Sequence, residues 1–392
     1  MTAHTSIVVI GGGYAGVLAA NRLQAHPDVT VTLINPRPEF VERIRLHQLA
    51  AGSDDAVAGF EQVLHPDIRL VVDTAVRIDA ETARVSLASG GELDYDYLVY
   101  AVGSSFTAPQ SVPGVDEFAC SVAEFEQARR LRARLQALPA GAPIVVVGAG
   151  LTGIETAAEL AELGRPVTLI GDTLAPSLGE GARAAVGRRL GKLGVALRLG
   201  PEVRRVDGHG VSLSDGSRIP AAITVWTAGF AVPQLAAESG LATDRIGRLL
   251  TDETLTSIDD ERIVACGDAV NPSGVPLRMS CQAAIPLGAQ AANTILARLA
   301  GTAPAPVDQA FTGQCISLGR RFGTVSIHHR DDSPRRAYIG GRTAAVIKEL
   351  VCRTTITALR REARKPGSAF YFRGGEPIRA QRAATAAQLV TP

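Results

Sequence analysis

Two segments of this chain combine an apolar strand-like run with a glycine pattern that can hold phosphate groups. They read VVIGGGYAG at residues 8–16 and VVVGAGLTG at residues 145–153, 137 positions apart. Both runs break into Gly-x-Gly-x-x-Gly and continue as an alanine-rich helical stretch. The first glycine allows a tight turn, the second lets a pyrophosphate approach, and the third lets helix and strand pack closely. These glycines are Gly11, Gly13 and Gly16 in the first copy and Gly148, Gly150 and Gly153 in the second.

A single copy of this pattern could be a tight turn without a ligand. Two copies, each in a strand–turn–helix context, predict two dinucleotides whose phosphates meet the free N–H groups of a helix N-terminus. Electron transfer is the usual reason for binding two dinucleotides side by side. Parallel strands that alternate with helices must position both loops. We therefore expect an α/β fold with two Rossmann-like dinucleotide-binding domains and a small C-terminal α+β domain.

The order of strand-like and helix-like runs predicts the domain boundaries. The first domain is expected to be discontinuous, at 1–112 and 256–302, and the second to span 113–255. A C-terminal interface domain is expected at 303–375, with a basic helix around 343–365. The tail at 376–392 has no strong periodicity and is expected to be flexible.

Composition excludes several classes of function. The chain has 392 residues, enough for two or three domains, and its 46% apolar and 20% charged residues are ordinary for a globular protein. A net charge of +1 gives no bulk attraction to nucleic acid. Five scattered cysteines without Cys-x-x-C or metal-ligand spacing indicate a reducing, cytoplasmic compartment and no metal site.

Four further segments return the chain to the expected nucleotide sites. DYLVYAVGS (96–104) and TVWTAGF (224–230) end strands at Ala101, Gly103 and Gly229, where small residues leave room for a ligand. RIVACGDAV (262–270) ends a strand at Gly267 and Asp268, whose carboxylate can accept hydrogen bonds from ribityl hydroxyls. QAAIPLGAQAA (282–292) begins a helix whose positive end could face a flavin pyrimidine ring.

Together these motifs resemble the flavoprotein superfamily with two dinucleotide-binding domains, which includes disulfide reductases, ferredoxin reductases and type II NADH dehydrogenases. The resemblance covers residues 5–300 strongly and 300–375 loosely. It implies FAD on the first motif and NAD(P)H on the second. It also implies that Glu155 lies near the stacked nicotinamide and flavin, where hydride would pass from NADH to the flavin. The residues implied to bind cofactor outside the pattern glycines are Tyr14, Ala15, Asn35, Ala101, Gly103, Asp172, Gly229, Gly267, Asp268, Gln282 and Ala283.

The absence of cysteine from PRPEFVERIRLHQLAAG (36–52) indicates the branch of this superfamily. Disulfide reductases carry a redox cysteine pair on this segment, so reduced flavin must here pass electrons directly to an acceptor. The chain is therefore most similar to the type II NADH dehydrogenases, whose acceptor is a quinone. Arg43 and His47 lie on this segment as candidates to stabilise an anionic flavin and to move a proton. A plain amphipathic helix would also explain both residues.

Three positions depart from the family pattern. Asn35 replaces the acidic residue expected to bind the FAD ribose, with one charged hydrogen bond fewer. Gly171 stands at the equivalent place of the second domain, and the carboxylate of the following Asp172 would repel a 2′-phosphate, which favours NADH over NADPH. Pro286 and Leu287 stand where quinone-reducing members have a glutamine, and a proline removes a helix hydrogen bond.

Several alternatives remain open at this level. Glu155 could be a solvent-facing helix carboxylate, Asp268 a turn cap, and Cys281 either a thiol of lowered pKa before a helix or an inert buried one. Residues 335–382 hold 12 Lys/Arg against 3 Asp/Glu, and the basic part at 335–365 could contact anionic lipid, a partner, solvent or a second subunit. The expected activity is an NADH dehydrogenase with a quinone-like acceptor, cytoplasmic or membrane-peripheral. A tailoring flavoenzyme acting on a small organic substrate, a ferredoxin-type reductase and a redox sensor are the alternatives.

Overall fold

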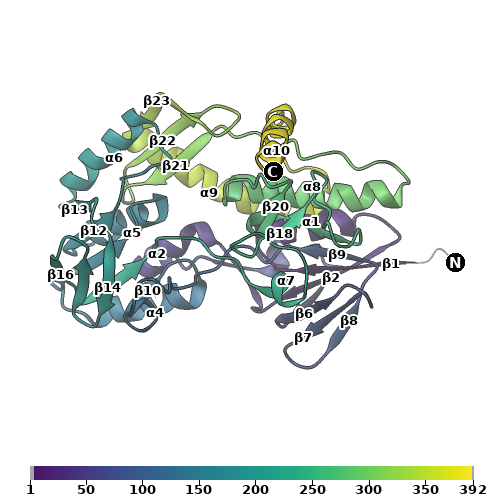
Figure 1. Cartoon of the computed structure of the whole chain (residues 1–392), viewed down its shortest axis with the longest axis horizontal. Helices are drawn as coiled ribbons and strands as arrows, with labels where there is room; N and C mark the ends of the chain where they lie inside the picture. Colours follow the sequence, from purple (N-terminus) through teal and green to yellow (C-terminus); the bar gives the residue numbers. More distant parts are fainter. Residues whose placement is uncertain (1–3, 391–392) are drawn as a thin grey trace.

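The computed structural model describes residues 4–390 and contains two five-stranded sheets of parallel strands, which lie on opposite sides of the molecule (Figure 1). The strand order is β19-β9-β1-β2-β5 in the first sheet and β10-β17-β11-β12-β13 in the second. Both sheets thus have the same order of parallel strands around the strand that precedes each glycine loop. The α/β class with two Rossmann-like domains is confirmed.

The first sheet forms from β-branched apolar runs that are buried by helices and by a small antiparallel sheet in one core. Helix α1 (Tyr14–Gln24) follows β1 and packs against α8 (Cys281–Leu299) and α9 (Gly341–Arg364). A buried ion pair joins α1 to α9, where Arg22 Nε lies 2.6 Å from Glu362 Oε1. The strands are β1 (Thr5–Ile10), β2 (Val29–Asn35), β5 (Arg69–Val72), β9 (Tyr97–Tyr100) and β19 (Ile263–Ala265).

The second sheet repeats this arrangement with its own buried core. Its strands are β10 (Ala119–Ser121), β11 (Ile144–Val147), β12 (Val167–Gly171), β13 (Ala196–Leu199) and β17 (Ile223–Trp226). Its helices are α4 (Phe125–Ala137), α5 (Leu151–Glu162) and α6 (Glu180–Lys192). Each domain also carries a small antiparallel sheet, formed by β6 (Ala75–Asp79), β7 (Arg84–Leu87) and β8 (Glu92–Asp94) in the first and by β14 (Val203–Asp207), β15 (Gly210–Leu213) and β16 (Arg218–Pro220) in the second.

Short elements connect these layers. The segment that carries Arg43 and His47 contains β3 (Glu39–Val41), a 3-10 turn η1 (Arg43–Arg45) and α2 (Leu46–Ala51). The remaining short elements are β4 (Val57–Gly59), η2 (Phe60–Gln62), α3 (Val115–Phe118), α7 (Leu235–Glu238), β18 (Leu249–Thr251), η3 (Gly267–Ala269) and β20 (Val270–Pro272).

The return from the second domain to the first comes earlier than we expected. Residues 232–255 were assigned to the second domain, but Val232, Leu235, Leu241 and Leu249 are buried in the core of the first. The glycine-containing turn after β17 already redirects the chain, and Ser105 pairs with Ala231 in a β-bridge at the crossing. Local hydrophobicity could not reveal which of two cores these side chains enter.

The C-terminal region forms an antiparallel sheet of β21 (Gly313–Ser317), β22 (Gly323–His328) and β23 (Pro334–Gly340), on which α9 packs. The tail expected to be flexible instead forms α10 (Glu376–Val390), which stands above α8 and α9 in Figure 1. Arg379 binds Glu253 through two hydrogen bonds of 2.9 Å. Because these contacts join residues far apart in sequence, local periodicity could not predict them.

No helix within residues 4–390 is long and apolar enough to cross a membrane.

Candidate active site

In the first glycine loop, each of the three pattern glycines has the environment that the sequence predicted for it. Gly11 has a φ of +106°, and a Cβ there would lie 2.3 Å from the carbonyl oxygen of Ala101. A Cβ on Gly16 would lie 1.9 Å from the oxygen of Gly11, so α1 can approach β1 only with glycine at this position. A Cβ on Gly13 would meet no described atom within 4 Å, so this backbone faces open space.

The second loop reproduces these three environments. Gly148 has a φ of +111°, and a Cβ on Gly153 would lie 1.8 Å from the oxygen of Gly148. A Cβ on Gly150 would meet no described atom within 4 Å. The N-terminal N–H groups of α1 and α5 receive no side-chain cap from the described residues. Both loops therefore present free donors to open space, which fits a pyrophosphate on each.

One cavity of about 1970 Å³ runs from the first loop to the second and on toward α9. Typical small-molecule pockets have about 300–1,000 Å³, so this volume suits two dinucleotides better than one. The cavity is lined by Gly11, Gly13, Tyr14, Ala15, Asn35, Arg43, His47, Ala101, Gly103, Gly148, Gly150, Glu155, Asp172, Gly229, Gly267, Asp268 and Gln282. Gly16, Gly153 and Ala283 do not line it, since the two glycines serve close packing and Ala283 is buried within α8.

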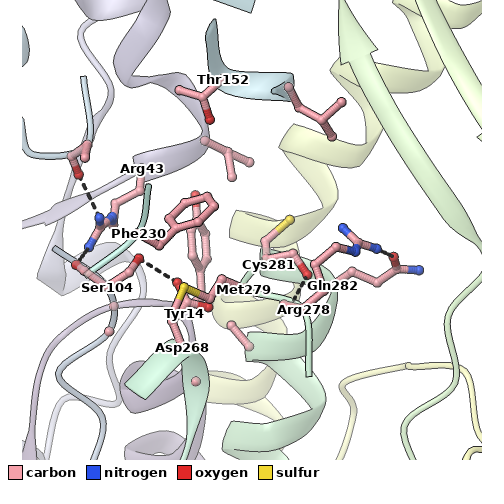
Figure 2. A pocket seen from close by; sticks show the side chains of 18 of the residues that line it. Tyr14, Arg43, Ser104, Thr152, Phe230, Asp268, Arg278, Met279, Cys281 and Gln282 are labelled. Carbon is pink, nitrogen blue, oxygen red and sulfur yellow. Dashed lines mark hydrogen bonds between the residues drawn. The ribbon is translucent and has the colours of Figure 1, made fainter. Parts of the chain in front are cut away.

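Asp268 lines the cavity, and hydrogen bonds of Ser104 and Arg43 fix its position. Ser104 Oγ donates to Asp268 Oδ2 at 2.8 Å, as Figure 2 shows. Arg43 donates to the carbonyl oxygen of Ser104 and, at 2.7 Å, to that of Ala123. Arg43 thus links the first domain to the second. Burial lowers the pKa of Arg43, and the nearby Asp268 carboxylate partly offsets this.

Glu155 is buried at the centre of a polar cluster on α5. Its Oε1 lies 3.1 Å from Nζ of Lys348 on α9 and accepts the backbone N–H of Ser317 at 2.9 Å. Its side chain lies 3.9 Å from Nδ1 of His47, and Ser317 Oγ contacts His47 Nε2 at 3.4 Å. The solvent-facing alternative for Glu155 is therefore wrong, because the residue is 8% exposed and joins three parts of the chain.

The charges of this cluster follow from burial and from the Lys348–Glu155 contact. Burial alone would raise the pKa of Glu155, but the ammonium of Lys348 holds it below its usual value. Burial opposes the charge of Lys348, but Glu155 outweighs it and raises the pKa of Lys348. Burial lowers the pKa of His47 to about 4, so its imidazole is neutral near pH 7 and has no spare proton to give.

The side-chain amide of Asn35 forms two hydrogen bonds to backbone groups. Its Oδ1 accepts the backbone N–H of Gly12 at 3.0 Å, and its Nδ2 donates to the oxygen of Arg37 at 2.7 Å. The amide therefore orders the glycine loop itself. Asp172, at the end of β12, is exposed and lines the cavity, where its carboxylate can meet a ribose.

The start of α8 lies at the middle of the cavity (Figure 2). Ser280 caps the helix by accepting the N–H of Ala283 at 3.3 Å. Gln282 accepts a hydrogen bond from Arg278 at 3.2 Å and donates to Thr312 at 2.9 Å, which directs its side chain toward the C-terminal region. Pro286 lies inside α8, which continues to Leu299 without a break.

Sequence reasoning missed Lys348. This lysine falls among residues that face inward on α9, such as Ala344, Cys352 and Thr355. A charged residue on the buried side of an amphipathic helix was the available signal. No group of three or more His, Cys, Asp and Glu residues within 4–390 could hold a metal ion.

Comparison with known proteins identifies the family. The family described as pyridine nucleotide-disulphide oxidoreductase matches residues 5–290. The chain belongs to this family. An NADH dehydrogenase-like protein of Mycobacterium tuberculosis is 34% identical over 74% of this chain and 80% of its own length. The type II NADH:quinone oxidoreductase Ndh of the same organism is 32% identical over 82% and 79% of the two chains.

Two solved structures of other oxidoreductases share the fold. The sulfide:quinone oxidoreductase of Aquifex aeolicus superposes with a TM-score of 0.76 at 21% identity, over 91% of this chain and 92% of that one. NDH2 of Plasmodium falciparum in complex with NADH has a TM-score of 0.76 at 16% identity, over 93% and 99%. Within the family this chain is an FAD-dependent NAD(P)H oxidoreductase, as the two glycine loops predicted.

Proposed function

We propose that this family member oxidises NADH and reduces a quinone, with FAD on the first glycine loop and NADH on the second. The observation that carries the proposal is the single cavity that joins both loops and continues to α9. Beyond the loops it is lined by Ile347, Val351 and Ala358 of α9, by Lys348, Arg361 and three threonines of the same helix, and by residues 368–372. The aliphatic and aromatic side chains of this extension suit a hydrophobic ring. The names of the bacterial relatives point to the same acceptor.

The residues of the chain serve binding, alignment and charge. The loop backbones would hold the two pyrophosphates, and Asp268 would hold the ribityl chain of FAD from the position that Ser104 and Arg43 fix. The bound flavin supplies hydride acceptance and electron transfer. The exposed carboxylate of Asp172 disfavours a 2′-phosphate, which supports NADH over NADPH.

Lys348 is the fixed cation of the buried cluster. Glu155 keeps its ammonium protonated, while His47 is neutral. We assign to Lys348 the stabilisation of negative charge on the reduced acceptor and to Glu155 the positioning of Lys348. His47 would position Glu155 through Ser317 rather than titrate.

We further propose that α9 and residues 370–372 contact an anionic membrane surface. Val346 and Leu350 are 68% and 59% exposed one turn apart on α9, and Phe370 is 79% exposed beside the cavity. Exposed Arg342, Arg353 and Arg361 belong to the same helix. Exposed apolar side chains ringed by basic ones are typical of interfacial helices. A quinone dissolved in lipid would reach the cavity from this side.

Anaerobic titration tests the proposal. The purified flavoprotein is reduced with stoichiometric NADH, and a menaquinone analogue is added while the visible flavin absorbance is followed. Bleaching by NADH and recovery with the quinone support the proposal. Bleaching without recovery would favour an organic substrate or a ferredoxin as acceptor, and the absence of bleaching by NADH would contradict the coenzyme assignment. Sedimentation with vesicles containing anionic lipid, compared with neutral vesicles, tests the membrane contact separately.

A further inference from the structure

Three of the five cysteines open onto the cavity. Cys281 begins α8, Cys315 lies in β21 and Cys352 lies in α9, so three separate elements bring a thiol to one site. Cys120 and Cys266 are buried elsewhere. All five cysteines lie within the described residues and are free thiols.

The three thiols lie near the Lys348 ammonium, close enough to influence its pKa. Cys352 lies one turn after Lys348 on α9, about 6 Å away between Cβ atoms. Cys315 and Ser317 are alternate residues of β21 and share a face, and Ser317 binds the Glu155 carboxylate that pairs with Lys348. Figure 2 shows the sulfur of Cys281 above the start of α8, directed toward the yellow-green helix α9.

The three cavity thiols have raised pKa values. Burial raises the pKa of Cys281 and Cys315 and brings that of Cys352 to about 12, against the effect of Lys348. Of the two alternatives for Cys281, the buried thiol is therefore the one that fits the structure. These free thiols are therefore protonated near pH 7, so they would react only with an electrophile that the cavity holds beside them.

We propose that Cys281 and Cys315 trap quinones that carry a ring hydrogen, and that the cavity therefore sustains turnover only with fully substituted quinones. This inference rests on the proposed quinone acceptor. In the trapping step the thiol sulfur attacks an unsubstituted ring carbon and forms one S–C bond. The thiol proton and the displaced ring proton end on the two quinone oxygens, so the adduct is a thioether-substituted hydroquinone and no other reductant is consumed.

Two features of the site favour this addition over reaction in bulk water. A quinone in the cavity is held beside the thiols, which raises their effective concentration. The Lys348 ammonium lies where it can stabilise negative charge that develops on a quinone oxygen during attack. A ring with substituents at all four positions offers no hydrogen to lose, so it cannot form the stable hydroquinone adduct.

The test uses the FAD-loaded full-length protein without NADH. It is treated with 1,4-benzoquinone or with tetramethylbenzoquinone, and adducts are located by intact mass and peptide mapping. We expect one or two benzoquinone additions at Cys281 and Cys315, formed at least roughly tenfold faster than at Cys120. Tetramethylbenzoquinone should leave no adduct and should slow benzoquinone labelling by competing for the cavity. The Cys281→Ser/Cys315→Ser protein should lose the fast additions, whereas the matched Cys120→Ser protein should keep them.

Labelling that is equally fast at Cys120, or that tetramethylbenzoquinone does not slow, would overturn the proposal. So would the absence of adducts at both Cys281 and Cys315. Because mapping the wild-type protein locates the adducts, the result does not depend on the variants folding. A separate assay of NADH-dependent tetramethylbenzoquinone reduction tests the acceptor assignment. If the cysteines are labelled but this quinone is not reduced, the proposed function is contradicted and the trapping proposal is not.

Discussion

Replacement of Lys348 by methionine probes the buried ion pair directly. The substitution preserves much of the side-chain volume and leaves the Glu155 carboxylate with Ser317 as its nearest donor. Removing one partner of a buried pair costs about 3–5 kcal/mol. Because the N–H and hydroxyl of Ser317 still bind Glu155, we expect the lower value, about 3 kcal/mol. NADH-dependent quinone reduction should fall in kcat more than in KM.

Denaturant unfolding measures this cost, with fluorescence of the single tryptophan as the readout. Trp226 is buried in β17 and its indole donates to the oxygen of Ala228 at 2.9 Å, so its emission reports the second domain. Glu155→Gln and the double variant complete a cycle, in which we expect a coupling of about 2–3 kcal/mol. The control is Arg353→Met on the exposed face of α9, expected to cost less than about 1 kcal/mol.

The pH dependence of the unfolding free energy tests the same ion pair and should change in a defined direction. In the wild-type protein the pKa of Glu155 is held below 4.5, so its stabilising contribution is present above that pH and is lost as the pH falls through the folded-state pKa. Without Lys348 the largest effect that opposes burial is lost, so we expect burial to raise the pKa of Glu155 above its usual value. The variant is then destabilised as the pH rises through the raised pKa of its Glu155. The difference in unfolding free energy between wild type and variant should therefore shrink as the pH is lowered from about 7 to about 5. A pH-independent difference, or additive single substitutions, would refute the reasoning.

Three further predictions test the loops, the coenzyme and the tail. Gly150→Val should raise the KM for NADH with little change in Tm, because the added side chain enters open space. Gly153→Ala should lower both activity and Tm, because its Cβ would clash with a carbonyl oxygen. Steady-state kinetics and thermal unfolding compare the two variants. Asp172→Ala should improve kcat/KM for NADPH relative to NADH by about fivefold, since one charge–charge contact through water is worth about 1 kcal/mol; equal ratios would contradict its assigned role. Arg379→Ala should release α10 and make it sensitive to limited proteolysis while NADH oxidation is kept; equal cleavage in both proteins would show that the ion pair does not hold α10.

The glycine loops were predictable because their constraints are local. The positive φ of Gly11 and the approach of Gly16 to the oxygen of Gly11 involve residues five positions apart, so the sequence pattern contains the geometry. The strand–helix alternation likewise follows from short-range periodicity. Both properties repeat in the second copy, which is why the fold class and family could be inferred without a structure.

The buried cluster was not predictable in the same way. Glu155 comes from α5, Ser317 from β21 and Lys348 from α9, and these residues are more than 150 positions apart at the extremes. Their contact depends on how the C-terminal region sits on both nucleotide domains, which no local pattern encodes. The same reason explains why α10 and the return of residues 232–255 to the first core were misjudged.

The position of the C-terminal region also bears on acceptor choice. The two nucleotide domains alone supply both loops, Asp268 and Glu155, but the partner of Glu155 and two of the three cavity thiols come from residues after 312. Loss of α9 would leave Glu155 buried beside a neutral His47 and without its compensating cation. Under the proposed function, residues of β21 and α9 therefore complete a site that the two nucleotide domains begin. We expect substitutions in β21 and α9 that face the cavity to alter acceptor preference more than the KM for NADH, which steady-state kinetics with several acceptors would measure.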